Sequence, residues 1–177
     1  MRVFDAKVKT VSPDGMKCVL PIADFQQMPG SMRIGTSLLS GEMITAAALP
    51  PPLPGRCNCQ KVRDRAWCAF AMVLVAAIIN GTGGYMGGAR LASGGLTHGP
   101  WRVLEAESAL RGVPANDANA NANANCVLAG ARGFGHNDFG IPLVRRTLRA
   151  VLTQGHQHPY GHDCTRPRNA KGRTSMP

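Results

Sequence analysis

The sequence predicts an α+β fold, with a small antiparallel sheet covered by two or three helices and preceded by additional strands. Three observations support this prediction. Residues 70–79 form an apolar run of strand length, residues 141–152 repeat apolar side chains at helical spacing, and residues 2–20 hold a turn signal between two extended segments. A length of 177 residues accommodates one ordinary domain, or one domain and a piece of another.

The N-terminal region is predicted to form strands that end at a proline-rich linker. Residues 2–11 alternate loosely, and Ser12-Pro13-Asp14-Gly15 is a strong turn signal, so residues 16–20 are expected to return as the second strand of a hairpin. Residues 21–25 are expected to form a short helical turn, and residues 41–49 another strand. The prolines of residues 50–54 cannot continue a sheet or a helix, which predicts a boundary between residues 1–54 and residues 55–154.

The second region is predicted to hold the sheet and its helices. Strands are expected at residues 60–62, 70–79 and 89–92, with a flexible hairpin connection as a loop over the glycine-rich residues 81–88. The strand at residues 70–79 is apolar on both faces, so it should be central or covered on both sides. Residues 103–110 and 141–152 are expected to be helices, the second with arginines on its outer face.

Two segments are predicted to lack regular structure. Residues 119–125 alternate Asn and Ala, and Asn competes with its own backbone for hydrogen bonds, so a low-complexity expansion is expected there. Residues 155–177 are rich in His, Pro, Gly and basic residues without periodicity, which predicts a disordered basic tail.

Composition argues against several classes of function. The formal charge of +10 is spread along the chain without a block of Lys and Arg interleaved with aromatic residues, so we expect no nucleic-acid partner. The apolar run of residues 69–79 is too short to cross a bilayer, and the N-terminus carries charges where an export signal needs an apolar core. We therefore expect no membrane association and an intracellular, reduced chain.

No catalytic residue or metal site is predicted. Cys57-Asn-Cys59 lacks a matching second pair and is interpreted as two loop thiols, and the cluster of His156, His158, His162 and Cys164 does not match the spacing of a compact finger. The ten acidic residues are scattered and form no catalytic pair.

Four segments together resemble one protein family. They are Lys61-Val-Arg-Asp-Arg-Ala-Trp-Cys-Ala-Phe70, Leu91-Ala-Ser-Gly-Gly-Leu-Thr-His-Gly-Pro-Trp-Arg102, the pair Ile22-Ala-Asp-Phe25 and Leu38-Leu-Ser-Gly-Glu-Met-Ile44, and Asn137-Asp-Phe-Gly-Ile-Pro-Leu-Val-Arg-Arg-Thr147. In this order and spacing they resemble the C-terminal part of the FAD-binding subunit of molybdenum hydroxylases, the family of xanthine dehydrogenase, aldehyde oxidoreductase and the carbon monoxide dehydrogenase flavoprotein.

The resemblance implies a truncated FAD-binding subunit of an oxidoreductase. Residues 1–54 would be a remnant of the flavin-binding subdomain, and residues 55–154 would form the family's C-terminal domain. The partners would be a molybdenum-cofactor subunit and an iron–sulfur subunit, and a homodimer contact would use the C-terminal domain. The location would be cytoplasmic, or periplasmic through a partner's export signal.

Two residues correspond to flavin-contacting positions of the family. Ile44 matches a residue that lines the flavin, and Lys61 matches a lysine near the isoalloxazine, where a cation stabilises negative charge on the reduced ring. The simpler alternatives are a core isoleucine and a solvated lysine at a strand edge. The family's glycine-rich pyrophosphate loop has no counterpart in this sequence, so only a partial FAD site is expected and the isolated chain is expected to be inactive. The alternative functions are a docking or dimerisation module without redox chemistry and a non-functional remnant.

Overall fold

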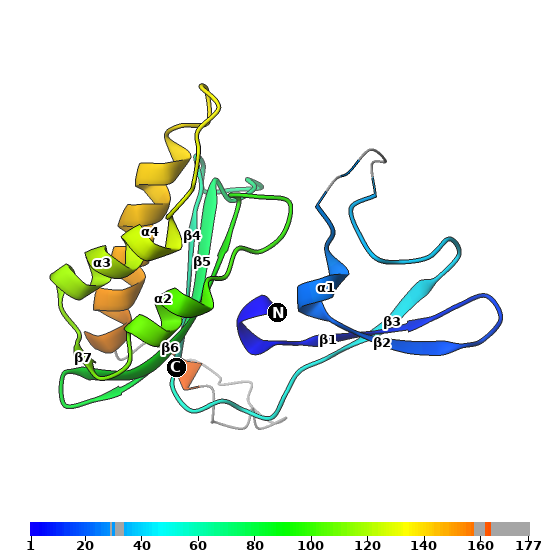
Figure 1. The fold of residues 1–177 in the computed structure, drawn as a ribbon, viewed down its shortest axis with the longest axis horizontal. Coiled ribbons are helices and arrows are strands. Elements are labelled where there is room, and N and C mark those ends of the chain that lie inside the picture. The colour runs from blue at the N-terminus through cyan, green and yellow to red at the C-terminus, as the bar shows by residue number, and fades with distance from the viewer. Residues whose placement is uncertain (29, 31–33, 158–161, 164–177) are drawn as a thin grey trace, which may run out of the picture.

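The chain folds into two lobes, each built on an antiparallel sheet (Figure 1). The computed structural model describes residues 1–28, 30, 34–157 and 162–163. The small lobe contains β1 (Lys7–Val11), β2 (Lys17–Pro21), α1 (Ile22–Phe25) and β3 (Met43–Ala48). The large lobe contains β4 (Arg56–Val62), β5 (Val73–Thr82), β6 (Tyr85–Gly94), α2 (Leu104–Ala109), β7 (Val113–Pro114), α3 (Asp117–Val127), α4 (Gly140–Gln157) and β8 (His162–Asp163). This arrangement confirms the predicted α+β class.

The small lobe is a three-stranded sheet with the order β2-β1-β3. β1 and β2 form the predicted hairpin, which pairs Val11 with Lys17 and Lys7 with Pro21. The turn is closed by the Gly15 N–H donating to the Ser12 carbonyl at 2.9 Å, and Gly15 has a φ of 84°, which glycine adopts without a steric penalty. The predicted helical turn and third strand are also present, as α1 and β3.

The large lobe is a five-stranded sheet with the order β7-β6-β5-β4-β8, so β5 is its central strand. Helices α2, α3 and α4 cover one face of this sheet (Figure 1), and α4 packs on β5 while α2 packs on β6. The core between sheet and helices contains Val73 and Val75 from β5 and Leu148 and Leu152 from α4, all fully buried.

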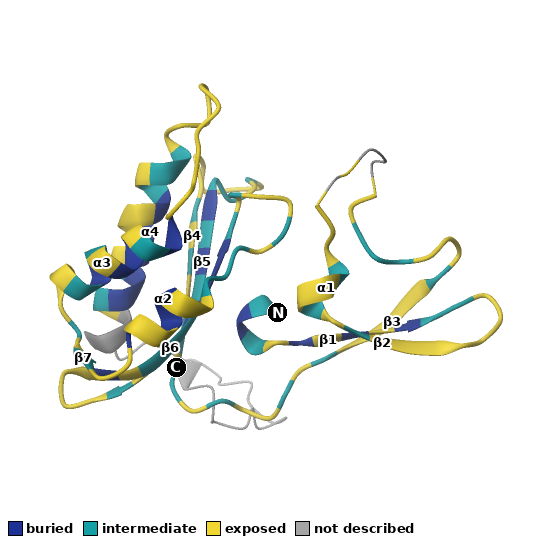
Figure 2. Ribbon diagram, viewed as in Figure 1, coloured by how far each residue is buried: buried dark blue, intermediate teal, exposed yellow. Residues whose placement is uncertain are grey.

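The opposite face of the large sheet is covered by the N-terminus. A 3-10 helix, η1 (Arg2–Phe4), places Val3 against Ile78 of β5 and Ala92 of β6, with Leu53 of the linker packed beside them. β5 is therefore covered on both sides, as its apolar residues on both faces predict (Figure 2).

The glycine-rich residues 81–88 form the predicted hairpin connection, but most of them are strand and not loop. β5 continues to Thr82, β6 begins at Tyr85, and only Gly83 and Gly84 lie between them. Both glycines have positive φ, 62° and 84°, as a two-residue turn between twisted strands requires. Most of the segment is thus strand, so its backbone groups are used in pairing and do not form a phosphate-binding loop.

The alternating Asn-Ala segment is helical, which corrects the prediction that it lacks regular structure. It lies within α3, where the Asn116 side chain caps the first turn by accepting from the Asn119 N–H at 2.9 Å. Ala120 and Ala124 are four residues apart and fully buried, so the small side chains of one helix face allow close packing on α4. Tertiary packing outweighs the weak helix propensity of Asn here.

Parts of the predicted C-terminal tail have regular secondary structure. α4 extends to Gln157, and His162–Asp163 pairs with Arg56 and Cys57 of β4, where an unstructured tail was expected. The other residues of the predicted tail lie outside the described part of the chain. No helix among the described residues has both the length and the apolar character needed to cross a membrane.

Candidate functional site

Lys61 lies on the face of the large sheet that carries no helices. It is opposite Leu74 in the pairing of β4 with β5, one residue from Val62, whose side chain packs into the helix-side core. Because side chains alternate along a strand, Lys61 points to the other face, on which η1 also packs. Lys61 is exposed, and β8 pairs only with the far end of β4, so Lys61 stands at a sheet edge within the described residues.

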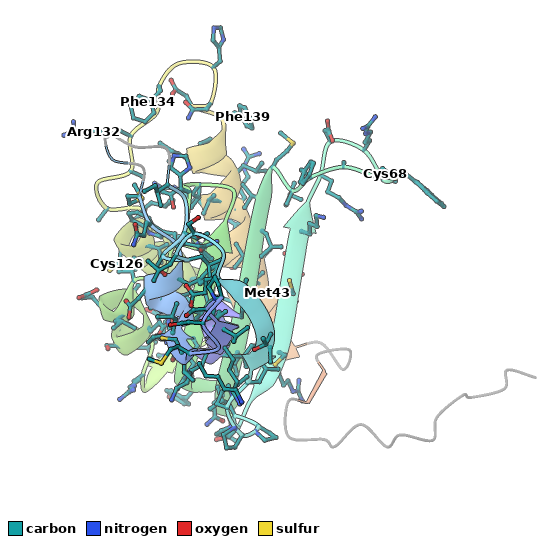
Figure 3. The ribbon with its side chains drawn as sticks, turned by 90° about the vertical axis from the view of Figure 1, so that its right-hand side faces the viewer. Met43, Cys68, Cys126, Arg132, Phe134 and Phe139 are labelled. Carbon is teal, nitrogen blue, oxygen red and sulfur yellow. The ribbon has the colours of Figure 1, made fainter. Side chains whose placement is uncertain are left out.

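The loop that follows Lys61 exposes two large aromatic side chains. Trp67 is 82% exposed and Phe70 is 96% exposed, although both are rich in apolar surface. The ends of the loop are joined by the Met72 N–H, which donates to the Val62 carbonyl at 2.9 Å. Figure 3 shows Cys68 on this loop, projecting away from the sheet. The loop packs little of its apolar surface on its own lobe, a pattern typical of a contact surface.

Ile44 lies in the small lobe on β3, opposite Thr10 of β1. It is 47% exposed, which does not support the alternative of a core isoleucine. Its neighbour Met43 is 64% exposed. Ile44 and Lys61 are thus on different sheets, and both are at the surface.

The Trp101-Arg102 pair is structural rather than part of a reactive site. The Trp101 Nε1–H donates to the Val127 carbonyl at 2.9 Å and so ties the sheet to the end of α3. The Arg102 guanidinium is 5% exposed and donates twice to Glu107, from Nε at 2.7 Å and from Nη2 at 3.0 Å. A bidentate pair of this kind has a fixed geometry and is charge-assisted.

Arg102 also connects the large lobe to the N-terminus. Its Nη1 donates to Asp5 Oδ1 at 2.6 Å and to the Arg2 carbonyl at 3.2 Å, while Glu107 accepts from the Leu91 N–H at 2.8 Å. Hydrogen bonding to Glu107 raises the pKa of Arg102 above its ordinary value, against the opposing effect of burial. The acidic residues of the chain thus include one buried structural carboxylate.

The ion pair of Arg102 with Glu107 was not predicted. The sequence had indicated only that the acidic residues are scattered and form no catalytic pair. The sequence signal for this pair was the separation of five residues between Arg102 and Glu107. Because α2 begins between them, its first turns bring the Glu107 carboxylate back toward Arg102.

The described residues hold no cluster of three or more His, Cys, Asp or Glu side chains that could bind a metal ion. Cys57 and Cys59 lie on β4, where two loop thiols were expected, and Cys57 is disulfide-bonded, where a reduced thiol was expected. The side chains of His156, His158, His162 and Cys164 lie outside the described part of the chain.

Lys61 and Ile44 have the chemical character that the resemblance implies for contacts with the ring end of a flavin. Lys61 supplies a cation and Ile44 an apolar surface, and both are accessible. The pyrophosphate needs a loop of free backbone N–H groups, and the glycine-rich residues 81–88 are instead paired in a hairpin. Residues 81–88 therefore offer no such loop for a pyrophosphate.

The fold resembles that of chains in two solved oxidoreductase structures. Quinoline 2-oxidoreductase from Pseudomonas putida 86 matches with a TM-score of 0.76 at 22% identity, over 89% of this chain and 54% of its own. Reconstituted CO dehydrogenase from Oligotropha carboxidovorans matches with a TM-score of 0.75 at 18% identity, over 89% of this chain and 55% of its own. At these identities the likeness shows the fold alone.

A closer sequence relative confirms the resemblance to FAD-binding subunits of molybdenum hydroxylases. The chain is 42% identical over 155 residues to the aldehyde oxidoreductase FAD-binding subunit PaoB of Escherichia coli (strain K12). The match covers 87% of this chain and 46% of the relative, so the chain spans about half the length of the curated relative. No family model matches the chain.

Proposed function

We propose that this chain is one part of the FAD-binding subunit of a molybdenum-containing oxidoreductase of the xanthine dehydrogenase and aldehyde oxidoreductase type. In this role it contributes one wall of the flavin site, through which electrons pass from iron–sulfur clusters to an acceptor. The observation that carries the proposal is the 42% identity to an aldehyde oxidoreductase FAD-binding subunit over 155 residues, which include the segments around Ile44 and Lys61.

The two exposed residues have distinct proposed roles. FAD, when bound, accepts and releases electrons at its isoalloxazine ring. The ammonium group of Lys61 would stabilise the negative charge of the reduced ring, and the Ile44 side chain would form an apolar wall that limits water at the ring. Neither residue reacts, so both act by electrostatics and positioning. The isolated chain, which lacks the pyrophosphate loop, is proposed to be inactive.

The proposed partners are a molybdenum-cofactor subunit and an iron–sulfur subunit. The exposed loop of residues 63–72 is consistent with such an assembly, because Trp67 and Phe70 present the kind of aromatic surface that interfaces bury. The proposed location is the cytoplasm, or the periplasm if a partner carries an export signal.

Purification from the source cells tests the assembly. A tagged full chain should recover molybdenum, iron and FAD with the partner polypeptides. Recovery of the chain alone, with none of these, would contradict the proposal. The purified chain by itself should bind no stoichiometric FAD, and stoichiometric flavin in the isolated chain would show that the partial-site proposal is wrong.

Substitution of Lys61 tests its role in the assembled complex. Lys61→Gln should lower the flavin reduction potential, because the positive charge that favours the reduced ring is lost, while Lys61→Arg should keep most of the effect. Lys17→Gln is the matched control, since Lys17 is an exposed lysine on β2. Equal potentials for all four proteins would contradict the role of Lys61.

The exposed edge of the small lobe favours a second candidate function, a docking or dimerisation module without redox chemistry. β3 has no strand partner on its outer side within the described residues, and its residues from Met43 to Ala47 are exposed and uncharged. Analytical ultracentrifugation distinguishes the candidates, because a stable dimer free of flavin and molybdenum would favour the second one. A homodimer contact through the large lobe remains part of this alternative.

A further inference from the structure

A hollow of about 310 Å³ lies where the linker crosses strands β5 and β6. Its apolar wall consists of Leu53, Pro54 and Ile78, and its polar rim is formed by Asn80, Arg90 and Arg111. The hollow is distinct from Lys61 and Ile44, neither of which lines it. An apolar wall beside a few convergent polar groups is typical of a small-molecule site.

Positive charge exceeds negative charge around this hollow. Arg90 Nη1 lies 2.8 Å from Asp5 Oδ2, but the same carboxylate also binds Arg102 at 2.6 Å and lies 3.7 Å from Arg2. A second carboxylate, that of Glu107, forms an ion pair with Arg102.

Arg111 adds a further guanidinium to the rim. The Arg111 side chain makes no hydrogen bond or ion pair with the residues that the structure describes, and Arg111 is exposed. Counted over this group, four arginines (Arg2, Arg90, Arg102, Arg111) face two carboxylates, which leaves an excess of two positive charges. Of the four, Arg90 and Arg111 line the hollow.

A β-bulge and two glycines lie at the hollow and place no side chains in it. The pairing of β5 with β6 shifts between Asn80 and Gly81, because Asn80 is opposite Gly88 and Gly81 is opposite Met86. Gly87 has no partner in this register and forms a β-bulge, and bulges are frequent beside binding sites. Gly87 and Gly88 line the hollow without side chains, and a Cβ added at Gly88 would meet no atom within 4 Å.

We propose that this hollow binds a phosphate group, with Arg111 and Arg90 as its cationic ligands and Asn80 as a neutral donor. A phosphate dianion matches the excess of two positive charges, and guanidinium groups bind phosphate through two parallel N–H donors. The wall of Leu53, Pro54 and Ile78 would accommodate an apolar group attached to the phosphate. The proposal does not depend on flavin binding or on the partner subunits.

Calorimetric titration of the full chain tests the proposal with two probes, inorganic phosphate and AMP. Arg111→Gln should weaken binding of both at least tenfold, and Arg111→Lys should keep part of it. Gly88→Val should also weaken binding, because it fills the hollow without changing the charge. Arg149→Gln is the matched control, since Arg149 is an exposed arginine on α4 and its replacement removes the same charge.

The relative affinities identify the source of the phosphate. AMP binding at least tenfold tighter than inorganic phosphate would assign a phosphate ester, and equal affinities would assign free phosphate. Absence of binding for both probes would overturn the proposal. An equal loss in Arg111→Gln and Arg149→Gln would also overturn it, because the attraction would then come from net charge. Unchanged thermal unfolding of each variant checks that the fold is retained.

Discussion

In the large lobe, five of the seven residues from Val73 to Ile79 are buried, whereas no residue of β2 or β3 in the small lobe is buried. In the large lobe, helices cover one face of the sheet and η1 packs on the other. The small sheet has one short helix, and β2 and β3 are largely exposed (Figure 2). Val19, Met43 and Ile44 are each about half exposed or more.

From this difference we propose that the large lobe folds as a unit by itself and that the small lobe belongs to a larger unit. A sheet usually needs a packed layer on at least one face, because its hydrophobic side must be removed from water. The match to about half of the relative's length agrees with this interpretation. The comparison predicts that substitutions in the large lobe are costly and that substitutions on the small sheet are tolerated.

The largest expected effect comes from the buried ion pair of the large lobe. Arg102→Met should lower the free energy of unfolding by about 3–5 kcal/mol, because it leaves Glu107 buried without its charged partner. Urea unfolding measures the change. Arg146→Met, at an exposed position of α4, is the control and should change stability by less than about 0.5 kcal/mol. Equal values for the two variants would contradict the structural role of Arg102.

A core truncation compares the two lobes directly. Leu148→Ala should cost about 2–5 kcal/mol, because the fully buried side chain leaves a cavity against β5. Val19→Ala on β2 should cost less than about 0.5 kcal/mol, because Val19 is 52% exposed. Thermal unfolding followed by circular dichroism gives both values, and a cost at Val19 that approaches the cost at Leu148 would show that the small sheet is packed in solution.

Helix capping offers a smaller test inside the large lobe. Asn116→Ala should lower stability by about 1 kcal/mol, since the Asn119 N–H loses its side-chain acceptor at the start of α3. Asn116→Asp retains an acceptor and should stay near the parent protein. If both variants unfold like the parent protein, α3 does not depend on this cap.

The smallest effect on stability is expected at the open edge of the small lobe. Met43→Lys should change the free energy of unfolding by less than about 0.5 kcal/mol, but it should reduce self-association, because a charge on an edge strand opposes pairing with another chain. Light scattering at increasing protein concentration measures the association. Met16→Lys, in the exposed hairpin turn, is the control and should leave association unchanged.

The sequence allowed the elements with clear periodicity to be predicted. The two-sided apolar run became the central strand β5, and the apolar residues of α4 repeat at the spacing that its buried face requires. The Pro13-Asp14-Gly15 turn likewise specified the first hairpin. In each case the local signal and the tertiary packing agree.

The missed elements are those in which packing overrides the local signal. In α3, Asn and Ala alternate, so every fourth residue is of the same type. Residues four apart lie on one face of a helix, and Ala120 and Ala124 therefore share a buried face. Asn123, on the same helix, donates to the Ala106 carbonyl at 2.6 Å, a contact between two helices that no local pattern reveals. The hairpin connection at Gly83 and Gly84 was expected, but the length of its strands was missed, because glycine on both strands resembles a loop.

The candidate site was predictable only through the resemblance. Nothing in the spacing of Ile44 or Lys61 marks them as cofactor contacts, and the structure places them on separate sheets as exposed residues. The role of Arg102 required the fold, because Asp5 lies nearly one hundred residues away in the sequence and reaches it only when η1 packs on the large lobe.

Hydrogen exchange of the purified chain, followed by mass spectrometry, tests the contrast between the lobes most directly. Amides of β5, β6 and α4 should exchange slowly, near the rate set by global unfolding, and amides of β2 and β3 should exchange much faster through local opening. Equal protection of β3 and β5 in the isolated chain would contradict the account that the small lobe is an incomplete unit.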